Sequence, residues 1–361
     1  MTHPTDILVG MSGGVDSSVT AALLLSQGHH VTGASMSRWR EGNGLRGGTN
    51  GACYGPEEPK QLAGAAEVCR QLGIDYRVFD CSAAFEAWIV AYFRQEYLAG
   101  RTPNPCIKCN AEIKFALLPQ KAREAGVPFT HFATGHYARV RQAEDGRWQL
   151  LRACDPLKDQ SYFLCRLTQE QLARQLFPLG ELEKTQTRQL ARQFGLQVSE
   201  KPDSQDFYSG ETAELLGEED REGEIVDDAT GAVLGHHSGY WKYTIGQRRG
   251  LGVASTRPLY VTAIEPEANR VRLGGVEAVR HHALEADDFN WVSVPEPSSP
   301  LPCQLKVRSV QKPVEAVLRP LGGGRFAADF PDGIYAVTPG QSAVLYQGDI
   351  LLGGGIIRAA K

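Results

Sequence analysis

The chain has 361 residues, a formal net charge of −4, 42% hydrophobic residues and 22% charged residues. This length exceeds what one hydrophobic core usually supports, so we expect two or three domains of an ordinary globular protein. The acidic balance excludes a nucleic-acid binder that relies on an overall positive field, because any RNA contact would need a local basic surface. We see no signal peptide and no apolar run near the ~20 residues that span a bilayer, and we expect a cytoplasmic protein.

The first third of the chain alternates short apolar runs with helical patterns. Strands are expected over residues 7–10, 30–36, 76–79 and 129–133, and helices over residues 17–27, 60–72, 83–99 and 111–125. This alternation predicts a parallel sheet with helices on both faces, which binds ligands at the carboxyl ends of its strands. Residues 39–59 are glycine-rich and predict a long loop of the functional or disordered kind.

Beyond residue 137 the pattern becomes mainly β. We expect a hairpin over residues 137–152, helices over 168–177 and 185–194, and short strands from 222 onward, with a linker at 295–300 and a small barrel or sandwich over 304–358. The predicted class is α/β, with a doubly wound parallel-sheet domain (1–210) followed by two small β-rich domains (211–280 and 281–361).

The most informative motif is Ser12-Gly13-Gly14-Val15-Asp16-Ser17, which follows the first strand and opens the first helix. Two glycines let the backbone approach phosphate oxygens, and a helix N-terminus offers free N–H groups, so the motif predicts a pyrophosphate site. Asp16 would repel phosphate unless a cation lies between them, so we expect Mg²⁺ there. No lysine follows the second glycine, which excludes an ordinary P-loop. The alternative is a plain strand–turn–helix with glycines for tight packing.

A second motif is the C-x-x-C pair Cys106 and Cys109, preceded by Asn104-Pro105. The two prolines at 103 and 105 predict an extended loop, with a helix beginning near Asn110. A cysteine at a helix N-terminus beside Lys108 is expected to have a lowered thiol pKa and to act as a nucleophile. Half of a zinc site, a redox pair, part of an iron–sulfur cluster and two inert thiols are the alternatives.

Residues 12–17 resemble the signature of the ATP pyrophosphatase (PP-loop) family, whose members split ATP between the α and β phosphates and adenylate an oxygen. The stretch around Cys109 resembles that of the tRNA-specific 2-thiouridylases. Four further segments match that family in order: residues 133–137, 158–163, 243–252 and 338–342. The resemblance implies ATP-dependent 2-thiolation of the wobble uridine of tRNA, in which adenylation of the C2 oxygen is followed by displacement of AMP by sulfur from a protein thiol, persulfide or cluster.

The same resemblance assigns residues and partners. It places ATP at Gly10, Met11, Ser12, Gly13, Gly14, Val15, Asp16, Ser17, Met36 and Gly135. It places the target base beside Asn104, Pro105 and Cys106, and tRNA at Lys158, Asp159, Gln160, Arg308 and Ser309. Cys109 falls at the catalytic cysteine, and we expect Cys106 and Asp16 to take part in catalysis. The implied partners are the anticodon loops of tRNAs for Lys, Glu and Gln, and a sulfur donor such as a cysteine desulfurase or a sulfur-relay protein.

Local basic clusters in the tail can supply the phosphate contacts that the net charge does not. Arg248 and Arg249 lie between glycines, and Lys306, Arg308 and Lys312 recur in the last domain. Such clusters favour RNA contact along the tRNA body, whereas the alternative is a solvated charged face.

The chain departs from the family at two places. Many members carry a second catalytic cysteine, which holds the persulfide, in the segment matching residues 201–210, where this chain has no cysteine and Tyr208 takes the place. Many also have Asp where this chain has Cys106. We therefore hypothesise that Cys106 and Cys109 form the thiol pair. The alternatives are an iron–sulfur cluster with Cys53 as third ligand, a tRNA-binding homologue that has lost sulfur transfer, and a PP-loop ligase acting on a small molecule.

Overall fold

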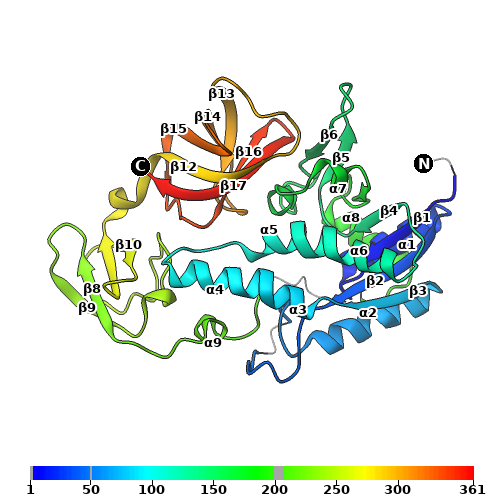
Figure 1. Ribbon diagram of the computed structural model, residues 1–361, viewed down its shortest axis with the longest axis horizontal. Helices are drawn as coiled ribbons and strands as arrows, with labels where there is room; N and C mark the ends of the chain where they lie inside the picture. The colour runs from blue at the N-terminus through cyan, green and yellow to red at the C-terminus, as the bar shows by residue number, and fades with distance from the viewer. Residues whose placement is uncertain (1–2, 49–50, 199–206) are drawn as a thin grey trace.

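The computed structural model describes residues 3–48, 51–198 and 207–361 (Figure 1). Its first sheet is entirely parallel, in the order β3-β2-β1-β4-β7. The strands are β1 (Asp6–Gly10), β2 (His30–Ser37), β3 (Asp75–Asp80), β4 (His131–Thr134) and β7 (Gln175–Leu176). The predicted α/β class, with a parallel sheet followed by β-rich parts, is confirmed.

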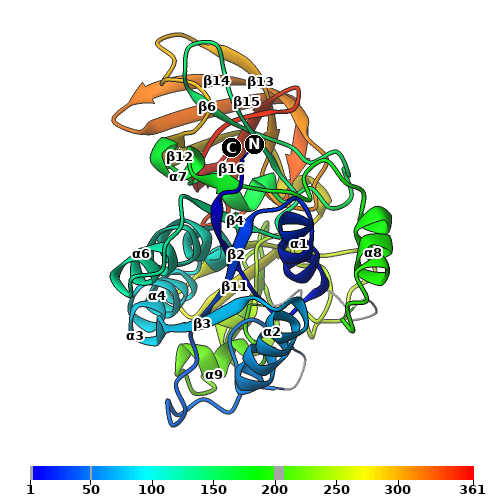
Figure 2. The same cartoon turned by 90° about the vertical axis from the view of Figure 1, so that its right-hand side faces the viewer.

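Helices cover both faces of this sheet, as Figure 2 shows. One face carries α1 (Val15–Ser26), α2 (Glu58–Leu72) and α8 (Lys184–Gln193). The other carries two helical rods: α3 (Ser82–Phe85), η1 (Glu86–Val90) and α4 (Ala91–Leu98), then α5 (Pro105–Cys109), η2 (Asn110–Leu117) and α6 (Leu118–Glu124). Strand side chains alternate between the faces, so Ile7 and Val9 pack with α1 while Leu8 packs with the opposite helices.

The helix expected over 168–177 is wrong. A capping box formed by Thr168 and Gln171 begins α7 (Gln169–Leu172), but the helix ends after four residues. The chain then forms β7, whose Gln175 pairs with Phe132 of β4. Backbone pairing at the open edge of the sheet therefore overrides the local helical pattern. The short helix η3 (Ser161–Leu164) precedes this region.

Two further β assemblies follow. A four-stranded sheet, in the order β10-β11-β8-β9, contains β8 (Gly223–Asp227), β9 (Val233–His237), β10 (Tyr260–Glu265) and β11 (Arg270–Gly274), flanked by α9 (Thr212–Leu216), η4 (Tyr240–Lys242) and η5 (Val276–Val279). A closed barrel, sealed by pairing of β12 with β17, contains β12 (Arg280–Trp291), β13 (Leu301–Lys306), β14 (Val314–Gly322), β15 (Arg325–Tyr335), β16 (Ser342–Gln347) and β17 (Ile350–Ala360).

The predicted hairpin forms as β5 (Arg139–Gln142) and β6 (Trp148–Leu151). Its second strand also pairs with the last strand of the barrel, where Leu150 and Leu151 lie opposite Leu351 and Ile350. The barrel is thereby joined by backbone hydrogen bonds to the N-terminal half of the chain. The domain boundaries at 210 and 280 stay predictions. Within the described ranges, no helix combines the length and apolar character needed to cross a membrane.

Candidate functional site

The carboxyl ends of β1, β2 and β4 open onto one cavity. Because β1 lies between β2 and β4, the strand order reverses there, which is where open α/β sheets bind ligands. The cavity measures about 250 Å³, and the residues predicted to contact ATP that line it are Gly10, Met11, Ser12, Met36 and Gly135. The other predicted ATP residues, 13 to 17, form the turn and the start of α1 beside it.

The turn before α1 requires glycine at one position and is held by hydrogen bonds to the hydroxyls of Ser12 and Ser17. Gly13 has a φ of +71°, and a Cβ there would lie 2.6 Å from the carbonyl oxygen of Gln61, so only glycine fits. The hydroxyls of Ser12 and Ser17 lie 3.1 Å apart, and Ser17 Oγ donates to the carbonyl of Gly14. Gly14 is the N-cap and provides no side chain to satisfy the first-turn N–H groups. This geometry suits an anion at the helix N-terminus.

Asp16 has a cationic partner within the chain. Lys184 Nζ donates to both carboxylate oxygens of Asp16, at 2.7 and 2.8 Å, and the Tyr137 hydroxyl donates to Oδ1 at 3.0 Å. Lys184 therefore places a positive charge beside Asp16, and the binding of Mg²⁺ with the ATP phosphates stays a prediction. Gly135 packs against this turn so closely that a Cβ would lie 2.7 Å from the backbone carbon of Asp16.

A second, larger cavity adjoins the first. It measures about 1200 Å³, and four thiols line it, those of Cys53, Cys106, Cys109 and Cys154. The side chains that line both cavities are Met36, Arg38, Cys53, Lys114, His136 and Gln160. The cavity at the carboxyl ends of the strands and the thiol cavity thus share a wall. A group bound in one cavity therefore lies close to a group bound in the other.

The thiol helix begins earlier than expected, at Pro105 rather than near Asn110. Asn104 is its N-cap and accepts a hydrogen bond from the Ile107 N–H at 3.4 Å, and a proline at the first helical position is favourable because its missing N–H would be unpaired anyway. Cys106 and Cys109 therefore lie one turn apart on one helix face. Asn104 caps the helix and Pro105 is buried, and neither is among the residues that line the cavity.

The expectation of lowered thiol pKa values is wrong. Burial raises the pKa of Cys109 to about 11 and that of Cys106 to about 12. Lys108, the cation on which the expectation relied, forms an ion pair with Glu112 at 2.6 Å. The cations that do lower the pKa of both thiols are Lys114, which the continuing helix η2 carries on the cavity side, and Arg38.

His136 lies in the wall that the two cavities share, and the sequence alone does not single it out as a site residue. Its Nδ1 lies 2.7 Å from the Thr134 hydroxyl, and burial lowers the pKa of the imidazole well below its usual value, with the charge of Lys114 adding to the effect. The ring is therefore neutral at physiological pH and suited to hydrogen bonding rather than to holding charge.

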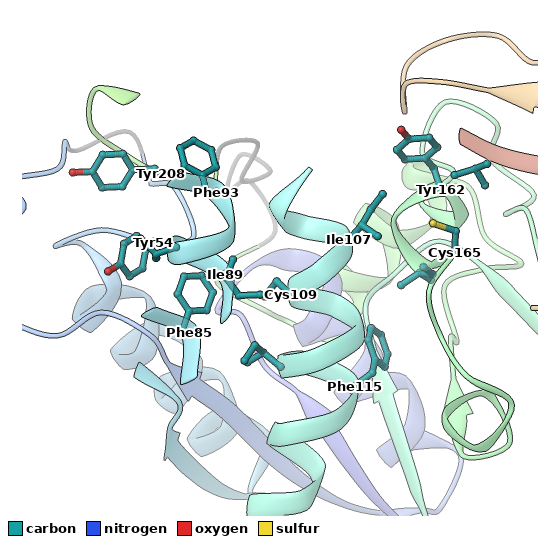
Figure 3. Packing of buried hydrophobic residues seen from close by; sticks show 14 of the residues in the cluster. Tyr54, Phe85, Ile89, Phe93, Ile107, Cys109, Phe115, Tyr162, Cys165 and Tyr208 are labelled. Atoms are coloured by element: carbon teal, nitrogen blue, oxygen red, sulfur yellow. The ribbon is translucent and has the colours of Figure 1, made fainter. Parts of the chain in front are cut away.

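The position of Tyr208 explains why it does not replace a cysteine. Its hydroxyl donates to Glu214 at 2.7 Å and its ring lies 6.0 Å from that of Tyr54 in an aromatic cluster (Figure 3), and Tyr208 is not among the residues that line the thiol cavity. Cys53 instead lies against this segment, since its thiol donates to the carbonyl of Phe207 at 3.4 Å. Residues 201–206 of the segment lie outside the described residues.

The thiols do not fit a metal centre. Among the residues that the structure describes, no group of three His, Cys, Asp or Glu side chains is arranged to hold a metal ion. Within that part of the chain, the structure supports neither the zinc alternative nor the iron–sulfur cluster with Cys53.

The predicted tRNA residues divide into two sets. Lys158, Asp159, Gln160 and Ser309 line the thiol cavity. Asp159 also accepts from the N–H groups of 153 and 161, and Gln160 Oε1 accepts from the Tyr137 N–H at 3.0 Å, so both hold the local turn in place.

Arg308, Arg248 and Arg249 lie apart from the cavity. Arg308 donates to Thr338 Oγ1 at 2.7 Å and to the Ile245 carbonyl at 3.2 Å, which ties the barrel to the central sheet region. Arg248 and Arg249 are exposed on a loop. Their contact with RNA stays a prediction.

A local basic surface, which an acidic chain would need for RNA contact, lies at the thiol cavity. Two carboxylates line it, those of Asp159 and Asp349, against seven basic side chains: Arg38, Lys114, Arg139, Arg152, Lys158, Lys306 and Lys312. Lys306 and Lys312 belong to the basic cluster that the sequence predicts in the last domain. Arg139 and Arg152 come from the hairpin, and no basic cluster in the sequence includes them.

Comparison with known proteins gives independent evidence on the family to which the chain belongs. Three family descriptions match consecutive parts of the chain: a tRNA methyl transferase HUP domain over residues 5–208, a tRNA methyl transferase PRC-barrel domain over 213–275, and an aminomethyltransferase beta-barrel domain over 281–357. The chain is 47% identical to a tRNA-specific 2-thiouridylase MnmA of Synechococcus sp. strain JA-2-3B'a(2-13), over 97% of this chain and 94% of the relative. It is 44% identical to the protein of that name in Geobacter metallireducens, over 98% and 97%. Among solved structures, an NMN synthetase from Francisella tularensis is similar with a TM-score of 0.35 and 16% identity, covering 55% of this chain and 66% of the other.

Proposed function

This chain belongs to the tRNA-specific 2-thiouridylase family, and we infer from that membership that it is an ATP-dependent sulfurtransferase acting on tRNA. We propose that the target is the wobble uridine of the tRNAs for Lys, Glu and Gln. The observation that carries the proposal is the shared wall between the glycine-lined cavity at the helix N-terminus and the thiol cavity. A base in the second cavity can present its oxygen to the α-phosphate in the first.

The chemistry follows from this arrangement. The C2 oxygen of uracil is a poor leaving group, and adenylation converts it into part of AMP, which leaves readily. The first-turn amides of α1 bind the phosphates, and Gly13 lets the backbone approach them. Mg²⁺ arriving with the ATP phosphates would neutralise the departing pyrophosphate. Lys114 borders both cavities, so its ammonium can stabilise the AMP as it leaves.

Sulfur transfer requires a carrier and an electron pair. We propose that a protein persulfide donor, such as a cysteine desulfurase or a sulfur-relay protein, loads one thiol of the Cys106–Cys109 pair. The terminal sulfur attacks C2, the C2–O bond breaks and AMP departs. The other thiol then attacks the carrier sulfur, which forms a Cys106–Cys109 disulfide and releases the 2-thiouridine, and an external dithiol reductant reopens the disulfide.

The test is a reconstituted reaction with ATP, unmodified tRNA, a cysteine desulfurase supplied with cysteine as the persulfide donor, and a dithiol reductant. We expect AMP and pyrophosphate to be released only when tRNA is present, and nucleoside mass spectrometry to detect 2-thiouridine. Cys109→Ala and Cys106→Ser should abolish thiolation while ATP binding survives, whereas Cys303→Ala, at a buried thiol inside the barrel, should change neither. Full thiolation by Cys106→Ser would refute the thiol pair, and absence of AMP release by the unaltered enzyme would refute the function.

A further inference from the structure

Two apolar side chains at the thiol cavity are almost fully exposed to solvent, so packing within the chain does not explain them. Leu157 is 91% exposed and Val310 is 93% exposed, whereas the next most exposed large hydrophobic side chain among the described residues, Val233, is 52% exposed. Both line the thiol cavity, although Leu157 comes from the turn between β6 and η3 and Val310 from the turn between β13 and β14. Single exposed hydrophobics are common, but a pair on two separate loops at one cavity indicates a ligand.

Both side chains are presented by fixed turns. Asp155 Oδ1 accepts a hydrogen bond from the Leu157 N–H at 2.9 Å. In the other turn, the Gln311 side chain accepts from the Val307 N–H at 3.0 Å, and the Gln311 N–H donates to the carbonyl of 308 at 3.2 Å. The backbone at both positions is therefore held by hydrogen bonds before any ligand arrives, which lowers the entropy cost of ordering these turns on binding.

Each apolar side chain has a lysine close by in the sequence. Lys158 follows Leu157 directly, and Lys312 lies two residues after Val310, and all four side chains line the cavity. A cation beside an apolar group suits a strand of nucleic acid, because phosphates meet the cation while exposed base faces meet the apolar group. The excess of basic over acidic side chains around the cavity favours RNA over a second protein as the occupant.

We propose that Leu157 and Val310 are wedges that occupy the gap left in the anticodon stack when the target uridine turns out into the thiol cavity. The inference rests on the proposed function and adds how the substrate is opened. Turning out a base costs a few kcal/mol of stacking, and apolar side chains inserted between bases offset this cost in other nucleic-acid complexes. The lysines beside the wedges would fix the register by contacting the flanking phosphates.

The test uses an anticodon stem–loop RNA that carries 2-aminopurine on the 3′ side of the target uridine, because its fluorescence rises when stacking is lost. The double variant Leu157→Ser/Val310→Ser is compared with Val233→Ser/Leu234→Ser, a matched pair of exposed apolar residues in the central sheet. At saturating protein we expect the fluorescence rise to fall at least threefold in the wedge variant. With sulfide as sulfur source, kcat/KM for thiolation should fall at least tenfold. The control pair should change neither quantity.

A second substrate separates wedging from general binding. An abasic nucleotide on the 3′ side of the uridine removes the stacking that must be broken, so the wedge variant should then come within twofold of the unaltered enzyme. A deficit that persists on the abasic substrate overturns the wedge role, as does an unchanged fluorescence rise. A deficit seen only with a protein sulfur donor would make these residues a donor-docking surface and would also overturn it. If the unaltered enzyme forms no 2-thiouridine, the proposed function fails, while the fluorescence still decides whether the residues open the RNA.

Discussion

The reactivity of Cys109 should follow pH in a way that a helix N-terminus alone would not predict. Burial raises the pKa of this thiol to about 11, from a usual value near 9. A raised acid pKa means that the neutral thiol persists to high pH. At pH 8 about one molecule in a thousand carries the thiolate, against about one in ten for an ordinary thiol. The difference of about two pKa units corresponds to roughly 3 kcal/mol against the charged form.

The assay is alkylation by isotope-labelled iodoacetamide, with peptide mapping to follow each cysteine separately. We expect the rate at Cys109 to rise tenfold per pH unit from pH 7 to 10 without levelling off, whereas N-acetylcysteine levels off near pH 9. Lys114→Met should slow the reaction further, because Lys114 lowers this pKa. Lys108→Met should leave it unchanged, because Lys108 forms its ion pair with Glu112.

A plateau below pH 9.5 would show that the helix N-terminus and nearby cations outweigh burial, and the reasoning from burial would be wrong. Equal alkylation rates at Cys109 in Lys114→Met and Lys108→Met would show that Lys114 does not act on the thiol. The sign of the effect on stability also follows. Unfolded chains ionise this thiol above pH ~8.5 and the folded chain does not, so its contribution to stability is present below that pH and declines as the pH rises toward 11.

Three further substitutions test other parts of the site. Gly135→Ala places a methyl group against the backbone of Asp16 and should reduce AMP formation more than tenfold in a pyrophosphate-release assay, whereas Gly64→Ala, where a Cβ meets nothing within 4 Å, should be neutral or slightly stabilising. Lys184→Met leaves Asp16 without its cation and should lower the unfolding free energy by about 2 kcal/mol and weaken ATP binding in calorimetry; unchanged ATP affinity would contradict the role given to the pair. Tyr208→Phe removes one hydrogen bond to a carboxylate and should cost about 1–2 kcal/mol in urea unfolding without loss of thiolation, so inactivity at normal stability would show that Tyr208 has a chemical role after all.

Local patterns were sufficient for the strands β1 to β4 of the parallel sheet and for the nucleotide turn, whereas they missed β7. The residues from Gly10 to Ser17 lie within one strand–turn–helix unit, so neighbours in sequence are neighbours in space. The thiol helix begins earlier than the prolines predict, because a proline disrupts a helix in its interior but not at its first position. Pro105 instead occupies the first helical position behind its Asn104 cap.

What the sequence could not show depends on long-range packing. Lys184 meets Asp16 across 168 positions of the chain, and no local pattern marks it as the partner. The thiol pKa values depend on how deeply helix and loop bury Cys106 and Cys109, which outweighs the neighbouring charges in the sequence. Leu157 and Val310 likewise cannot be recognised as neighbours from the sequence, because they come from two distant loops that meet only at the folded thiol cavity.

The pairing of β6 with β17 affects how the chain matures during synthesis. Leu151 is made about 200 residues before its partner Ile350, so at the ~5–20 residues per second of translation the outer edge of β6 waits roughly 10 to 40 seconds for it. Unpaired strand edges readily recruit other chains. Nascent chains on neighbouring ribosomes, and products cut short before the last strand, should therefore be the forms of this protein that most need a chaperone.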